Sequence, residues 1–106
     1  MDVPPEVAFR NVERNEAVDR KIVEGIEKLE KVHPRLTSCR VAVEDPHPGR
    51  ESGRLYRIRI DLGVPGGEVV VTRDPPRRPD EDLLQAVGEA FDTARRRLRK
   101  HVEKRR

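Results

Sequence analysis

The sequence predicts an α+β fold with the element order β-α-β-β-β-α, in which two helices pack on one face of a four-stranded sheet. Three observations lead to this prediction. Two segments repeat apolar residues every three or four positions, several short segments alternate apolar with polar residues, and Pro and Gly separate the segments. With 106 residues, the chain is expected to form a single domain, residues 1–106, around one modest core.

The first elements are a short strand and a helix. The apolar run of residues 7–9 predicts the strand, and the helix is predicted over residues 16–32 with Asn15 as its N-cap. Pro34 ends the helix, because the residue before a proline is disfavoured in helical geometry. The residues that form one apolar stripe on this helix are Val18, Ile22, Ile26, Leu29 and Val32.

Three strands follow as a meander. Residues 39–44 and 56–62 alternate apolar and polar side chains, which is the period-two pattern of a half-buried strand. Residues 65–67, Pro-Gly-Gly, predict a tight turn in which glycine supplies a positive φ. Residues 69–71 continue as the partner strand. We therefore expect a mostly antiparallel sheet.

The last element is a long helix, expected to begin near Pro79 with acidic residues 80–82 in its first turn. At about 1.5 Å per residue it would be about 35 Å long, so its basic end is expected to project past the core. Pro75 and Pro76 are interpreted as part of a stiff connection into this helix, with a polyproline ligand as the alternative. The residues of its apolar stripe are Leu83, Val87, Ala90, Phe91, Ala94, Leu98 and Val102.

Basic residues are concentrated at the C-terminal end. Residues 95–106 hold eight Lys or Arg and one Glu, a net charge of +7, whereas the other 94 residues hold 15 basic and 19 acidic residues, a net of −4. In the first helix, projection at about 100° per residue sorts the cations largely onto one flank. These cations are Arg20, Lys21, Lys28 and Lys31. The pattern predicts an anion-binding surface, most often for nucleic acid, with a solvated face and a basic tail as the alternative.

The sequence shows no catalytic or metal-binding pattern. His33, His47 and His101 lie far apart, without a second ligand at metal spacing. The glycines match neither a phosphate-binding loop nor a dinucleotide fingerprint. Cys39 is expected to be a buried core residue rather than a nucleophile, and the acidic residues 44–45 are expected to be solvated. We expect no enzyme activity, no cofactor and no metal.

The aromatic residues do not indicate a base-stacking surface, and the sequence contains no pattern typical of a targeting segment. Tyr56 and Phe91 lie on apolar stripes, so both are expected in the core rather than as platforms for stacking bases. No stretch approaches the roughly 20 apolar residues of a membrane span, and the N-terminus has no signal-peptide pattern. The protein is therefore expected in the cytoplasm, without a membrane partner.

Several segments resemble one family. Residues 9–12 (FRNV), 15–18 (NEAV) and 26–31 (IEKLEK) are similar to the first strand and helix of the ribosome hibernation-promoting factor family. That family includes ribosome-associated inhibitor A (protein Y) and the so-called sigma-54 modulation proteins. Residues 81–83 (EDL) and 99–101 (RKH) resemble its second helix, and the resemblance extends over nearly the whole chain.

The resemblance implies a function. Members have the β-α-β-β-β-α fold and bind the small ribosomal subunit (30S, 16S rRNA) between head and body, in the path of mRNA and of the A- and P-site tRNAs. They silence ribosomes during stress or stationary phase. The chain is thus expected to be a monomeric translation silencer that does not bind DNA. By position, the expected RNA-binding residues are Lys28, Lys31, Arg96 and Lys100, with Arg97, Arg99 and Lys104 as neighbours.

Three positions depart from the family pattern. Gly25 replaces a basic residue, Thr93 replaces a frequent lysine, and Leu84 replaces a common tyrosine. The chain is also expected not to pair ribosomes into 100S particles, because it lacks the dimerisation domain of long members. Two other functions remain open: a general binder of structured RNA, or a protein-interaction module that uses the basic C-terminal helix.

Overall fold

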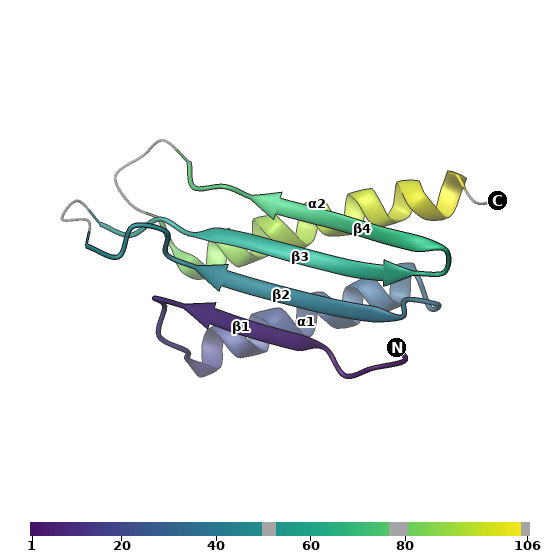
Figure 1. Cartoon of the computed structure of the whole chain (residues 1–106), viewed down its shortest axis with the longest axis horizontal. Coiled ribbons are helices and arrows are strands. Elements are labelled where there is room, and N and C mark those ends of the chain that lie inside the picture. Colours follow the sequence, from purple (N-terminus) through teal and green to yellow (C-terminus); the bar gives the residue numbers. More distant parts are fainter. Residues whose placement is uncertain (50–52, 77–80, 105–106) are drawn as a thin grey trace.

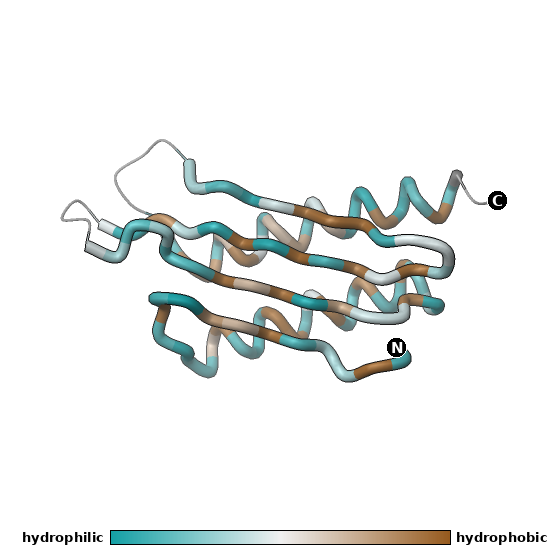
Figure 2. Tube along the Cα trace, in the orientation of Figure 1, coloured by the Kyte–Doolittle hydropathy of each residue, from teal (hydrophilic) through white to brown (hydrophobic). Residues whose placement is uncertain are grey.

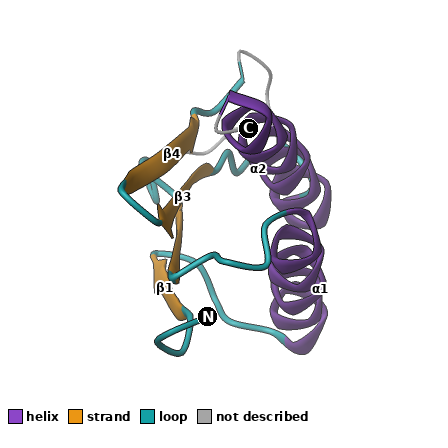
Figure 3. Ribbon diagram, turned by 90° about the vertical axis from the view of Figure 1, so that its right-hand side faces the viewer, coloured by secondary structure: helices purple, strands orange, loops and turns teal. Residues whose placement is uncertain are grey.

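Two helices cover one face of a four-stranded sheet and leave the opposite face open (Figure 1, Figure 3). This computed structural model describes residues 1–49, 53–76 and 81–104, apart from the side chain of Lys104. The predicted element order is confirmed. The elements are β1 (Glu6–Arg10), α1 (Glu16–Val32), β2 (Ser38–Glu44), β3 (Arg57–Val64), β4 (Gly67–Arg73) and α2 (Leu83–Lys104).

The sheet has the strand order β1-β2-β3-β4, with β1 parallel to β2 and the other two pairs antiparallel. The predicted mostly antiparallel meander is therefore confirmed. The register aligns Val7, Val41, Ile60 and Val71 in one row across all four strands. In the β3–β4 turn, Gly66 has a φ of 83°, the positive value that the Pro-Gly-Gly segment predicts.

The core lies between the sheet and the helices. Brown and teal alternate along the strands in Figure 2, because successive side chains point to opposite faces of a sheet. The alternation buries Val41, Val43, Ile58 and Ile60 completely. On α2, small side chains let the helix backbone lie close to the sheet: Ala86, Ala90 and Ala94 are all buried. Cys39, Tyr56 and Phe91 are core residues, as predicted.

The predicted element boundaries are close to those observed. Helix α1 spans the predicted residues, and the side-chain oxygen of Asn15 accepts a hydrogen bond from the Val18 amide at 2.9 Å. Strands β1 and β4 are longer than predicted at both ends, β2 begins one residue earlier, and β3 begins one residue later and ends two residues later. The prediction used side-chain alternation, whereas a strand continues for as long as backbone pairing does.

The start of α2 differs from the prediction. The helix begins at Leu83, and Asp82 accepts a hydrogen bond from the Leu84 amide at 2.8 Å instead of lying inside the first turn. Residues 77–80, including the expected start, lie outside the described part. Glu81 does not lie in the first turn of the helix either. Its carboxylate forms an ion pair with the Arg73 guanidinium at 2.6 Å and accepts a hydrogen bond from the Tyr56 amide at 2.7 Å.

One further expectation is wrong. Asp45 is 2% exposed rather than solvated, and its carboxylate accepts a hydrogen bond from the His47 amide at 3.0 Å.

The expected projection of the basic end of α2 is limited to its last turn. Leu98 is fully buried, so the basic segment still packs along the sheet over residues 95–98. Val102, the last residue of the predicted apolar stripe, is half-buried and lies outside the core.

The two helices run parallel and meet at Gly25. A Cβ atom at this position would lie 2.5 Å from a ring carbon of Phe91, well inside van der Waals contact. The missing side chain therefore lets the aromatic ring of α2 pack directly on the backbone of α1. Gly25 is buried in the middle of α1, where a larger residue would push the helices apart.

We predict that Gly25→Ala destabilises the protein, although alanine is the better helix former. The methyl group would overlap the Phe91 ring, an overpacking cost of about 1–3 kcal/mol that exceeds a helix-propensity gain of about 0.5–1 kcal/mol. Chemical denaturation measures the free energy of unfolding. The matched control is Gly88→Ala, whose Cβ would meet the flexible end of the Lys21 side chain, with Cε at 3.2 Å and Nζ at 3.6 Å. We expect Gly88→Ala to be neutral or stabilising, and equal effects of the two variants would contradict the packing argument.

We also predict that Cys39 is unreactive in the folded protein. Burial raises the pKa of its thiol to about 11, with smaller contributions from the carboxylates of Glu30 and Asp61. At pH 8 the native thiolate is therefore scarce, and a disulfide reagent such as Ellman's should react slowly until guanidinium unfolds the chain. Because the unfolded thiol ionises near pH 9, the free energy of unfolding should fall from about pH 9 to about pH 11. Rapid stoichiometric labelling of the native chain at pH 8 would contradict both statements.

Candidate nucleic-acid interface

The arginines of the open sheet face are paired with carboxylates. Arg40 contacts Glu6 at 3.1 Å and Arg59 contacts Asp61 at 2.8 Å, while Arg57 bridges two carboxylates at 3.0 Å each. Exposed pairs of this kind add little stability. They do, however, neutralise the positive charge of this face, which makes it a poor surface for a polyanion.

The cations of the helix layer are different. Within the described part of the chain, seven of them form no ion pair and no hydrogen bond, and six of these are exposed while Arg95 is half-buried. They are Arg20, Lys21, Lys28, Lys31, Arg95, Arg99 and Lys100. Their guanidinium and ammonium groups are thus available to an external anion, and they lie on the side of the molecule opposite the open sheet face.

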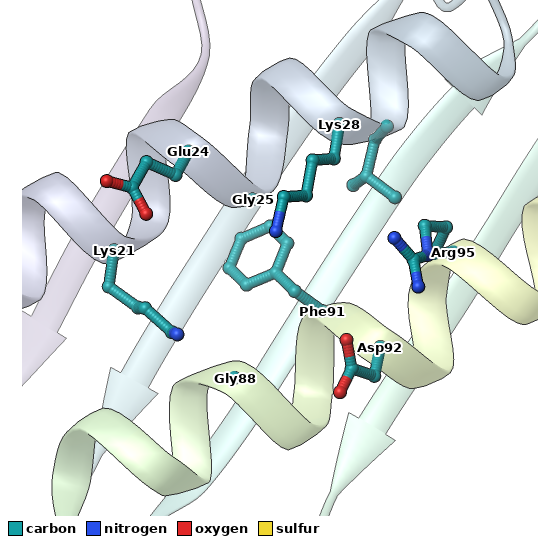
Figure 4. A pocket seen from close by; sticks show the side chains of 9 residues that line it. Lys21, Glu24, Gly25, Lys28, Gly88, Phe91, Asp92 and Arg95 are labelled. Atoms are coloured by element: carbon teal, nitrogen blue, oxygen red, sulfur yellow. The ribbon is translucent and has the colours of Figure 1, made fainter.

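The sorted flank of α1 faces α2. A pocket of about 80 Å³ between the helices is lined by Lys21 and Lys28 of α1 and by Arg95 of α2, with Gly88 and Phe91 among the other residues (Figure 4). We call this pocket the seam groove. Its complete lining is Lys21, Glu24, Gly25, Lys28, Leu29, Gly88, Phe91, Asp92 and Arg95.

A second, shallower pocket lies where both helices approach their C-terminal ends. Lys31 and Arg99 line it from the two helices, together with Val32, Val102 and Glu103. Three of the expected RNA-binding residues, Lys28, Lys31 and Arg99, therefore border the line along which the helices meet. Parallel packing brings together cations that are about 70 positions apart in the sequence. We call the side of the helix layer on which these cations lie the cationic face.

Arg96 and Lys100 form the outer ridge of α2, one helical turn apart and both exposed. The Thr93 hydroxyl accepts a hydrogen bond from the Arg96 guanidinium at 3.3 Å and donates to the Glu89 carbonyl at 3.1 Å. Thr93, where the resemblance implies a lysine, thus orients Arg96. Leu84, where the resemblance implies a tyrosine, is 38% exposed at the beginning of α2.

Arg97 is placed apart from the other expected RNA-binding residues. Its guanidinium donates a hydrogen bond of 3.0 Å to the Val70 carbonyl of β4, the edge strand of the sheet. Arg97 therefore satisfies an edge carbonyl and shields that edge from pairing with another strand. The side chain of Lys104 lies outside the described part.

The sequence did not predict one feature of this region. His33, the C-cap of α1, stacks on His101 of α2 with ring centroids 6.2 Å apart. Only the alignment of the two parallel helices could have indicated this pair. Among the described residues no group of three or more His, Cys, Asp or Glu side chains is placed to hold a metal ion. Nor does any helix in that part have the length and apolar character needed to cross a membrane.

Comparisons with known proteins agree with this picture. The model of the family described as Sigma 54 modulation protein / S30EA ribosomal protein matches residues 6–106. The N-terminal domain of protein Y from Thermus thermophilus has a similar fold, with a TM-score of 0.71 and 20% identity over 95% of this chain and 99% of that one. A ribosomal subunit interface protein from Coxiella burnetii has a TM-score of 0.67 and 10% identity over 93% and 97%. No curated protein sequence matches the chain at a significant level.

Proposed function

The chain belongs to the Sigma 54 modulation protein / S30EA ribosomal protein family, and from this membership we propose that it silences translation by binding the small ribosomal subunit. The proposed site is the 16S rRNA of the decoding channel, where bound protein excludes mRNA and tRNA. The proposed setting is the cytoplasm during stress or stationary phase, with the chain acting as a monomer and without catalysis.

One observation carries the proposal: among the described residues, the cations without partners lie on the helix layer, apart from Arg35 in the connection after α1, whereas the arginines of the sheet face are already paired. Ribosomal RNA presents closely spaced phosphates, and cations on a rigid surface neutralise them without reading sequence. We propose that the RNA contacts are made by Lys28, Lys31, Arg96, Arg97, Arg99, Lys100 and Lys104.

These residues should not contribute equally. Arg99 and Lys100 have no partner among the described residues, so they contact phosphate without breaking another interaction. Arg97 must first give up its hydrogen bond to the Val70 carbonyl, which then remains unpaired at the sheet edge. Its loss should therefore weaken RNA binding least. Single substitutions should have graded effects, because each removes one contact of several.

We predict that the protein co-sediments with 30S subunits and 70S ribosomes on sucrose gradients at about 100 mM salt. With six to ten phosphate contacts, the affinity should fall by about 10³–10⁵ between 50 and 200 mM salt. Saturating protein should also prevent initiator tRNA and mRNA from binding 30S subunits. Normal tRNA binding to saturated subunits would exclude the decoding channel.

Two further measurements distinguish ribosome binding from the two alternative functions. A general binder of structured RNA would bind unrelated folded RNA as tightly as it binds 30S subunits. A protein-interaction module would keep its partner after nuclease treatment. Failure to sediment with ribosomes even at low salt would overturn the proposal.

We further predict that Arg96→Glu with Lys100→Glu weakens ribosome binding by at least tenfold and leaves the melting temperature nearly unchanged. Both side chains are exposed on the outer ridge of α2, away from the core. The matched control reverses the same charge on the open sheet face, with Arg10→Glu and Arg40→Glu. Because the control changes net charge equally, equal losses of affinity would mean that only net charge matters. A large loss of stability in the ridge variant would contradict its placement.

A further inference from the structure

The seam groove differs from the rest of the cationic face because it is a pocket. Its floor consists of the Phe91 ring and of two positions without side chains, Gly25 and Gly88 (Figure 4). A Cβ at Gly88 would lie 3.2 Å from Cε and 3.6 Å from Nζ of Lys21. The bare backbone at Gly88 is therefore what allows the Lys21 side chain to lie across α2, with its ammonium group at the groove.

The charges around the groove are only partly compensated. Lys21, Lys28 and Arg95 approach it from two helices, and none has a partner among the described residues. Two carboxylates, Glu24 and Asp92, also line it, which leaves a formal charge of +1. Three cations held around one small space repel one another, and an anion between them relieves this repulsion.

The pocket has room for a small anion. Its volume of about 80 Å³ exceeds the roughly 10–15 Å³ that one water molecule needs by the same measure, so a phosphate group can enter it. The Phe91 ring is only 7% exposed, so it offers no face on which a base could stack. An arginine fork and lysine ammonium groups are the side chains that bind phosphate oxygens best.

We propose that the seam groove seats a single phosphodiester group of an RNA backbone, held jointly by Lys21, Lys28 and Arg95. A phosphodiester carries one negative charge, which matches the formal charge of the groove. Glu24 and Asp92 oppose a second anion in the same place. This proposal rests on the proposed function, because it specifies how one point of the cationic face recognises RNA.

Binding of one phosphate in the seam groove and diffuse binding of RNA to the cationic face differ in how the RNA affinity depends on salt. Salt dependence of affinity counts phosphates neutralised, not cations present. In the groove three cations serve one phosphate, whereas on the ridge each cation meets its own. Removing the three groove cations should therefore reduce the slope of log K against log salt by about 0.7–0.9, the value for one phosphate.

The first experiment compares two triple variants in ribosome binding. One variant carries Lys21→Gln, Lys28→Gln and Arg95→Gln. The control removes the same charge from exposed positions with Arg96→Gln, Arg99→Gln and Lys100→Gln. We expect the control to reduce the slope by about 2 or more and the groove variant by about 0.7–0.9. Equal reductions would overturn the single-phosphate seat.

The second experiment needs no ribosome. Dimethyl phosphate, a free phosphodiester, is titrated into the ¹⁵N-labelled chain and followed by NMR, with inorganic phosphate as a second probe. We expect saturable shifts of the Gly25 and Gly88 amides, with the diester preferred, and no such shifts in the groove variant. No saturable shift up to about 100 mM, or a uniform shift of all surface amides, would overturn the seat.

Gly88→Ala tests the geometry. The added methyl group should displace Lys21 and weaken dimethyl phosphate binding at least threefold, with an unchanged or higher melting temperature. If Gly88→Ala binds dimethyl phosphate as tightly as the unchanged chain does, Lys21 does not contact the phosphate. The two proposals fail separately: a chain that binds the diester in the groove but not ribosomes refutes only the proposed function, and a chain that binds ribosomes but not the diester refutes only the seat.

Discussion

The contact between Gly25 and Phe91 controls the arrangement of the helix layer. Because Gly25 has no side chain, the backbone of α1 can lie against the Phe91 ring of α2. The space between them is too small for even a methyl group. The contact sets both the distance between the helices and their alignment. Every feature that combines residues of the two helices depends on it, from the seam groove to the stacked pair of His33 and His101.

The same contact brings cations of the two helices together. The family resemblance implies a basic residue in the first helix where this chain has Gly25. In the structure, Gly25 provides the close contact that places Lys21 and Lys28 beside Arg95. The resemblance likewise implies a lysine where the chain has Thr93, whose hydroxyl orients Arg96.

The open sheet face and the helix layer differ in how many of their cations form ion pairs, and not in whether they contain cations. Both faces hold basic residues, but the arginines of the open sheet face are paired with carboxylates, on a neighbouring strand for Arg40 with Glu6 and within one strand for Arg59 with Asp61. A separate pair, Arg73 with Glu81, is mostly withdrawn from solvent and connects the end of β4 to the segment before α2. It holds the start of that helix at the sheet, and the rest of α2 then lies along β4 with its unpaired cations facing away from the core.

Local patterns in the sequence determined most of the fold. Helix α1, the strand alternation, the β3–β4 turn and the burial of Cys39 all follow from periodicity, capping and glycine chemistry, which act over a few residues. The concentration of cations was equally visible. Tertiary structure alone decided which charges are free, because an ion pair such as Arg57 with Glu44 joins different strands. It also decided that Asp45 is buried, that Arg97 serves the β4 edge, and that a groove exists at all. These depend on side chains from distant segments meeting in space, which no local pattern encodes.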